Sequence, residues 1–139
     1  MLTLAVDQST AVNSVALLDG EAVLWETRWT RAEARGPQLV AVIEAALAGL
    51  GRAPAQIEAF AVGVGPGSYS GLRMSISAVR AWALPGGRPV CGVSSAEALA
   101  RDAMDETGAR TAAVAGDARR GRLWLGRAAW VAARFGPIR

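Results

Sequence analysis

The chain has 139 residues, about the length of one domain, and 52% of them are hydrophobic, which is enough to form a core. It contains no histidine and no lysine, and its fifteen basic residues are all arginine. This composition excludes catalytic triads and metal sites that need histidine, and it excludes the P-loop lysine and Schiff-base lysines. Since arginine does not act as a general base, the composition favours a non-catalytic protein.

The net charge of +3 conceals an asymmetry between the two halves of the chain. Residues 1–70 carry four arginines and seven acidic residues, whereas residues 71–139 carry eleven arginines and five acidic residues. The halves therefore have net charges of −3 and +6, and the basic surplus is densest in residues 117–139. A solvated face, an acidic protein neighbour and a contact with nucleic acid all fit such a surplus.

No hydrophobic run approaches the roughly 20 residues that a membrane-spanning helix needs, and no basic leader precedes the first apolar stretch. We therefore expect a cytoplasmic protein without a membrane anchor. The single cysteine, Cys91, lies in an apolar stretch, which predicts a buried thiol without a chemical role.

The first part of the chain predicts three strands and a helix. A short apolar run ends at Asp7, and the next two strands are joined by Asp19-Gly20, a frequent turn of β-hairpins. Gly36-Pro37 then breaks the chain before a helix rich in alanine and leucine, which Gly51 ends. The predicted strands span residues 2–6, 13–18 and 22–29, and the helix spans residues 38–50.

The second part predicts a strand, a glycine-rich loop and a second helix that ends before a Pro-Gly-Gly turn. A buried strand comes next, and Ser94 or Ser95 then caps a third helix, with Glu97 suited to its first turn. Two more strands follow. The predicted strands span residues 57–64, 90–93, 111–115 and 123–131, the loop spans residues 65–71, and the helices span residues 72–84 and 95–104.

This order of elements predicts an α/β fold in which helices cover a mixed sheet, without internal repeats. We expect one main domain at residues 1–104. The acidic segment 105–108 is the expected linker, so residues 105–139 would hold the linker and the beginning of an incomplete second domain.

Polar residues directly after the first strand are one candidate for a ligand site. Asp7, Ser9 and Thr10 place an acid and two hydroxyls at a strand end, where such groups can hold a metal-bound water and a phosphate. The same residue types also cap turns between strands. Both interpretations remain open at this point.

The glycine-rich segment 63–71 is the second candidate, because it lies between a strand and a helix. Its glycines would let backbone N–H groups at Gly65, Gly67 and Ser68 approach an anion at the start of the helix. The spacing fits neither a dinucleotide-binding fingerprint nor a P-loop. A tight structural turn is therefore the alternative to an anion site.

The first two helices each carry apolar residues on two opposite sides. One stripe of each helix can pack on the sheet, and the other can cover the neighbouring helix or bind another protein. The stripes predicted to face the sheet are Leu39, Ile43, Ala46 and Leu50 in the first helix and Leu72, Ile76, Val79 and Ala83 in the second. The outer stripes, predicted to form a protein interface, are Ala41, Ala45, Ala48, Met74, Ala78, Ala81 and Trp82.

Three segments together resemble the TsaB family, also called YeaZ, whose members are often labelled glycoprotease-like or peptidase M22. They read LAVDQST at residues 4–10, AVGVGPGSYSGLR at residues 61–73 and CGVSSAEALA at residues 91–100. The middle segment carries a long Gly-Pro-Gly-Ser-aromatic-Ser-Gly-hydrophobic-Arg signature, and the order of the three segments agrees with the family. Residues 115–121 resemble the beginning of the family's second domain.

The resemblance implies an actin- and Hsp70-like fold, related to ribonuclease H and the ASKHA group, without catalytic activity of its own. It implies a subunit that supports the formation of N6-threonylcarbamoyladenosine in tRNA by binding a TsaD-like catalytic subunit, with a TsaE-like ATPase joining the complex. It further implies a homodimer when the chain is alone, tRNA contact that is indirect or weak, and no cofactor or metal. The polar residues above would then form a vestigial phosphate site.

The chain departs from the family pattern in three places. Residues 31–36 replace a His-Ser-Glu-like stretch, and Arg122 stands where the family tends to have an acidic residue. Family members also continue past residue 139, so we expect a truncated second domain. The alternative function is a small nucleotide-binding kinase or ATPase of the ASKHA group, with Asp7 to Thr10 facing the glycine-rich loop.

Overall fold

The computed structural model of the chain describes residues 1–30 and 38–129, apart from the side chains of Arg119 and Ala129. Contacts divide the chain into two compact units, Met1–Ser95 and Ala96–Arg139. The departures from the family pattern at residues 31–36, and the residues from Trp130 onward, lie outside the described residues.

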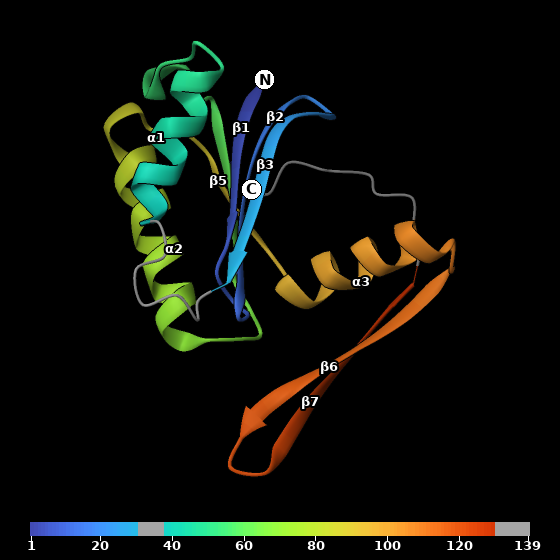
Figure 1. Cartoon of the computed structure of the whole chain (residues 1–139). Helices are drawn as coiled ribbons and strands as arrows, with labels where there is room; N and C mark the ends of the chain where they lie inside the picture. Colours follow the sequence, from blue (N-terminus) through green and yellow to red (C-terminus); the bar gives the residue numbers. More distant parts are fainter. Residues whose placement is uncertain (31–37, 130–139) are drawn as a thin grey trace. The chain divides into compact units, whose positions relative to one another are not determined.

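The first unit is built on a five-stranded mixed sheet with the strand order β3-β2-β1-β4-β5 (Figure 1). The first three strands form an antiparallel meander, and β4 and β5 extend the sheet in parallel with β1. This arrangement confirms the predicted mixed sheet. The strands are β1 (Leu2–Asp7), β2 (Val12–Asp19), β3 (Ala22–Thr30), β4 (Ala59–Gly63) and β5 (Val90–Val93).

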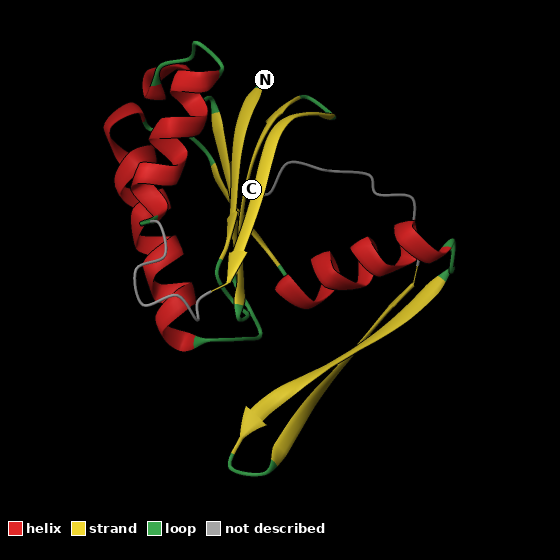
Figure 2. Ribbon diagram, in the orientation of Figure 1, coloured by secondary structure: helices red, strands yellow, loops and turns green. Residues whose placement is uncertain are grey.

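Two helices, α1 (Leu39–Gly49) and α2 (Tyr69–Ala83), lie side by side on one face of this sheet (Figure 2). Alternate residues of β1 and β2 point into the layer between sheet and helices, which is the core of the unit. Two short 3-10 helices, at Pro54–Gln56 and Leu84–Gly86, follow α1 and α2. The buried core consists of Leu2, Leu4, Val6, Val15, Leu17, Leu39, Ile43, Ala46, Leu47, Ile57, Phe60, Val62, Val79 and Ala83.

The end of α1 is as predicted, whereas α2 begins three residues earlier than predicted. Gly51 follows α1 with a φ of +63°, and its N–H donates to the carbonyl of Ala48 at 3.0 Å. At α2, the hydroxyl of Ser68 accepts a hydrogen bond from the N–H of Gly71 at 3.4 Å. Because Ser68 caps the helix, residues 69–71 form its first turn and do not belong to the loop.

The line of α2 that packs most deeply on the sheet differs from the predicted stripe. The buried residues are Gly71, Ser75, Val79 and Ala83, while Leu72 and Ile76 are half-buried. Small side chains along the contact let the helix approach the strands closely. Ser75 is completely buried, and its hydroxyl donates a hydrogen bond to the carbonyl of Gly71 or Leu72, both at 3.1 Å, so its polar group has a partner.

The prediction that β5 is buried was wrong. All four residues of the strand are exposed, including Cys91, which is a free thiol. The reason is topological, since β5 is the last strand of the sheet and pairs only with β4 among the described strands. An apolar sequence alone does not distinguish such an edge strand from a central one.

The second unit contains a helix and a hairpin. The helix is α3 (Ser95–Thr107), whose first residue, Ser95, still belongs to the first unit, and the hairpin consists of β6 (Thr111–Arg119) and β7 (Arg122–Ala129). Residues 105–107, expected to be a linker, form the last turn of α3. The contacts divide the chain at residue 95, within the domain predicted to reach residue 104. None of the helices in residues 1–30 and 38–129 is long and apolar enough to cross a membrane.

Arg88 ties the end of α2 to the segment that leads into β4. Its Nη1 donates hydrogen bonds to the carbonyls of Pro54 at 2.9 Å and Ile57 at 3.0 Å, and its Nη2 donates to the carbonyl of Trp82. The guanidinium also lies over the ring of Phe60, 5.2 Å from the centroid. One side chain thus satisfies three carbonyl groups on two segments.

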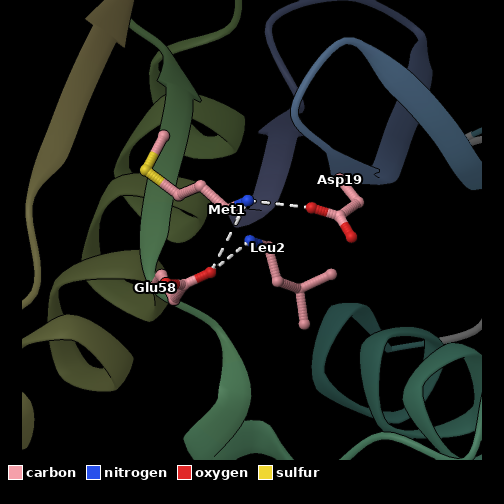
Figure 3. A network of polar contacts seen from close by, with 4 residues as sticks. All are labelled: Met1, Leu2, Asp19 and Glu58. Atoms are coloured by element: carbon pink, nitrogen blue, oxygen red, sulfur yellow. Dashed lines mark hydrogen bonds and ion pairs between the residues drawn. The ribbon is translucent and has the colours of Figure 1, made fainter.

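The amino group of Met1 joins β1, β2 and the start of β4 in an exposed polar network (Figure 3). It donates a hydrogen bond to Oδ1 of Asp19 at 2.8 Å and lies 3.8 Å from Oε2 of Glu58. Glu58 in turn accepts a hydrogen bond from the N–H of Leu2 at 2.7 Å. The hydrogen bond with Asp19 raises the pKa of the Met1 amino group above its ordinary value of 8.0.

This network predicts a dependence of stability on pH that has two limits. The contribution of the amino group is complete below pH 8.0 and is lost as the pH rises through the raised pKa of the folded state. The pKa of Asp19 lies below its ordinary value of 3.8 because the amino group donates to it, so its contribution is lost as the pH falls through that lowered pKa. Asp19→Asn should return the pKa of Met1 towards its ordinary value in an NMR titration. An unchanged pKa would show that the contact does not persist in solution.

Candidate functional site

Asp7, at the end of β1, uses both carboxylate oxygens within the first unit. Oδ1 accepts a hydrogen bond from the N–H of Ser9 at 2.6 Å, and Oδ2 accepts one from the hydroxyl of Ser95 at 2.6 Å. The hydroxyl of Ser95 itself accepts from the N–H of Gly65 at 3.1 Å. The carboxylate therefore connects the end of β1 to the glycine-rich loop through Ser95, 88 residues further along the chain.

The glycine-rich loop packs against this site closely enough to require glycine. A Cβ atom on Gly63 would overlap Oδ2 of Asp7 and lie 2.5 Å from its Cγ. A Cβ atom on Gly67 would overlap the carbonyl oxygen of Ser9 and lie 2.7 Å from its Cβ. Gly63 at the end of β4 and Gly67 in the loop are thus required by close packing, whether or not a phosphate binds.

Two of the three backbone N–H groups predicted to bind an anion already have partners within the chain. The N–H of Gly65 donates to Ser95 at 3.1 Å, and that of Ser68 donates to the carbonyl of Ser9 at 2.6 Å. A phosphate bound by the loop in this conformation would have to compete for these donors. The contacts favour the structural turn over the anion site.

Thr10 completes the set of predicted site residues. Its hydroxyl donates to the carbonyl of Val12 at 2.8 Å and accepts from the N–H of Val12 at 3.1 Å, so it stabilises the turn between β1 and β2. The structure therefore brings Asp7, Ser9, Gly65, Gly67 and Ser68 together and gives Thr10 a local role. Among the described residues, no group of three or more potential histidine, cysteine or carboxylate ligands is placed to hold a metal ion.

Sequence reasoning missed three residues of this region. Ser95 donates a hydrogen bond to Asp7, and the resemblance offered a signal for it because it lies in a matching segment. Gln8 and Asn13 are buried beside the site, and their side-chain oxygens have no hydrogen-bond partner among the described residues. The hydroxyl of Ser9 is buried in the same unpaired state.

The predicted interface residues divide into two groups. Ala78 and Trp82 are half-buried and pack against the core, so the prediction that they lie on the outer side of α2 was wrong for these two. Each of them directly precedes a residue of the buried line, Val79 or Ala83, which brings it to the edge of that line. The exposed residues of the set are Ala41, Ala45 and Ala48 on α1 and Met74 and Ala81 on α2.

A family model and the curated relatives that match this chain agree on one family of proteins. The family model for TsaD, described as tRNA N6-adenosine threonylcarbamoyltransferase, matches residues 33–136. TsaB from Escherichia coli K12, a tRNA threonylcarbamoyladenosine biosynthesis protein, is 32% identical over 89% of this chain and 53% of its own length. TsaB from Bacillus subtilis is 30% identical over 91% of this chain and 54% of its own length. The chain thus spans about half the length of these curated relatives.

Solved structures give the same result for the fold. YeaZ from Pseudomonas aeruginosa superposes with a TM-score of 0.86 at 32% identity, over 94% of this chain and 61% of that protein. The match confirms the expected actin- and Hsp70-like fold and the resemblance found in the three sequence segments. By these matches the chain belongs to the protein family described as TsaD, tRNA N6-adenosine threonylcarbamoyltransferase, and it is a homologue of TsaB, or YeaZ.

Proposed function

We propose that this chain is a non-catalytic subunit that supports the formation of N6-threonylcarbamoyladenosine in tRNA. It acts in the cytoplasm by binding a TsaD-like catalytic subunit, with a TsaE-like ATPase joining the complex. The names of its TsaB relatives support the process, since they are described as tRNA threonylcarbamoyladenosine biosynthesis proteins. The absence of histidine and lysine supports the non-catalytic part.

The engagement of Asp7 supports the same conclusion. A carboxylate that is to position a metal-bound water needs oxygen atoms directed at the ligand, whereas both oxygens of Asp7 accept hydrogen bonds from this chain. The alternative, a small nucleotide-binding kinase or ATPase, would need the carboxylate to serve a ligand beside these contacts or in place of them. ATP turnover by the purified chain alone would favour that alternative and contradict the proposal.

We propose that the partner binds at the exposed face of α1 and α2. We call it the α1–α2 surface and define it by Ala41, Ala45, Ala48, Met74 and Ala81. Met74 is 55% exposed, and the charged residues exposed on the two helices are Glu44 on α1 and Arg73 and Arg80 on α2. Small residues on neighbouring helical faces permit close helix packing, and an exposed methionine beside them is typical of an interface.

Binding to the catalytic partner is the direct test of this function. A TsaD-like subunit should co-purify with the chain, and tRNA modification by that subunit, the TsaE-like ATPase and ATP should fall when the chain is withheld. A partner that neither binds nor depends on the chain would contradict the proposal. In the absence of the partner, we expect the α1–α2 surface to form a homodimer, which light scattering would detect.

A charge at the centre of the α1–α2 surface should prevent association. Ala45 is exposed on α1, so Ala45→Arg leaves the core unchanged but places an unpaired cation in the contact. We expect about 3 kcal/mol of lost association, or roughly a hundredfold in Kd, measured by calorimetry with the partner. Ala22→Arg, an equal change at an exposed residue of β3, is the matched control. Equal affinity of both variants would place the interface elsewhere.

A further inference from the structure

The β6–β7 hairpin concentrates positive charge in a short segment. Residues 110–129 carry five arginines and one acidic residue, a net charge of +4. Residues 95–107 of α3, the other element of this part of the chain, carry four acidic residues and one arginine, a net charge of −3. The basic surplus of the second half of the sequence therefore belongs in large part to the hairpin.

Three of these arginines lie at the tip of the hairpin. Arg120 and Gly121 form a two-residue turn, and both have positive φ angles, 54° and 71°. On either side of the turn, Arg119 and Arg122 are direct cross-strand partners. Arg120 and Arg122 are exposed.

This arrangement is unfavourable for the fold of the hairpin. A turn with two positive φ angles prefers asparagine, aspartate or glycine at its first position, and arginine there costs on the order of 1 kcal/mol. A local cost at an exposed point of a fold indicates a function at that point.

We propose that the hairpin tip, defined as residues 119–122, is a phosphate-binding contact for RNA. Arginine presents a planar fork of donors that binds phosphate oxygens in a bidentate manner. A two-stranded ribbon with a two-residue turn is narrow enough to follow the sugar-phosphate backbone at a groove. The choice of tRNA as the RNA rests on the proposed function, and a contact made by a few arginines is weak and strongly salt-dependent.

An acidic protein surface is the competing partner for such a tip. Protein interfaces are usually centred on aromatic or aliphatic residues, and residues 117–122 contain none that is larger than alanine. Leu123 and Leu125 are exposed further along β7, at 78% and 77%, and they are the features that would favour a protein contact. The tip itself has the composition of a phosphate contact, so the observations favour RNA.

Arg120→Asn is the variant that separates binding from folding. Asparagine suits the positive φ of this turn position, so the hairpin should become slightly more stable while one cation is lost. We expect affinity for an unmodified tRNA transcript to fall roughly five- to tenfold at 0.1 M salt, and the salt slope of log K to fall by about one. Fluorescence anisotropy with the full chain alone measures both quantities. Arg52→Asn, which removes an exposed arginine of the first unit, is the matched control.

The outcomes of this experiment are distinct. A loss of affinity and slope in Arg120→Asn, together with unchanged values in Arg52→Asn, supports the contact. Equal losses in both variants would mean that only net charge matters, and unchanged binding in both would mean that the tip does not touch RNA. In a separate binding assay with the TsaD-like subunit, a tip variant that keeps its RNA affinity but no longer binds that subunit would replace RNA with a protein partner. The anisotropy experiment omits the TsaD-like subunit, so a negative result there would contradict the RNA contact but not the proposed function. Conversely, a failure to bind the TsaD-like subunit would contradict the proposed function but not the RNA contact.

Discussion

Gly63→Ala is expected to destabilise the chain by at least about 3 kcal/mol, which would lower the Tm by about 10 °C or more. The added methyl group would overlap Oδ2 of Asp7, and it would also lie 2.9 Å from the hydroxyl oxygen of Ser95, which is hydrogen-bonded to the same carboxylate. Gly63 is buried in β4, so neither the strand nor the carboxylate can move without breaking the hydrogen bond between Asp7 and Ser95. Thermal unfolding followed by circular dichroism measures the effect.

Gly49→Ala is the matched control for this substitution. Gly49 is the last residue of α1, and a Cβ atom there would meet nothing within 4 Å. The same chemical change should therefore leave stability unchanged or raise it by up to about 1 kcal/mol, through helix propensity. The double variant Asp7→Ala/Gly63→Ala should recover part of the loss, because the overlapping carboxylate is gone. A single variant as stable as the control would show that Asp7 is held less tightly than the contacts indicate.

Arg88→Met is expected to cost about 3 kcal/mol, because it leaves three carbonyl groups without their donor. Methionine keeps much of the apolar stem, so the change isolates the loss of the guanidinium from the loss of packing. Hydrogen bonds from a charged donor contribute roughly 1.5 to 3 kcal/mol each, and the half-buried position of Arg88 reduces the sum. Urea unfolding at constant pH measures the difference from the wild type.

Arg88→Lys tests whether the geometry or the charge of Arg88 matters. A lysine ammonium cannot reach the carbonyls of Pro54, Ile57 and Trp82 at once in the arrangement of the planar guanidinium. We expect this variant to lose about 2 kcal/mol, while Arg52→Met, at an exposed position, should lose less than about 0.5 kcal/mol. If lysine restored full stability, the charge over the ring of Phe60 would be the dominant contribution.

The order of strands and helices followed from the sequence because hydrophobic periodicity and turn residues act locally. Asp19-Gly20 and Gly51 were sufficient to place a hairpin turn and a helix end. The exposure of β5 could not be predicted in this way, since it depends on the position of the strand within the sheet. The burial of Ser75 could not be predicted either, because it depends on which side of α2 packs on the strands. A helical wheel with two apolar stripes does not show which side that is.

The candidate site shows the same limit at the level of single residues. Asp7 and the glycine-rich loop stood out because an acid at a strand end and glycines before a helix can both serve a phosphate ligand. Ser95 did not, because a serine before an apolar helix already has an explanation as a cap, whereas its hydroxyl bonds to Asp7. Gly63 is necessary because β4 pairs with β1, which brings it against the side chain of Asp7. A local sequence pattern does not show which residues become neighbours through strand pairing.

The exposed thiol on β5 gives the chain a built-in attachment point for chemical probes. Cys91 is the one cysteine in the sequence, so a maleimide dye or a nitroxide would react at a single known position without prior mutagenesis. The strand that carries it pairs with β4 directly beside the glycine-rich loop. A label there would report on the opening of that loop as a change in fluorescence or spin mobility.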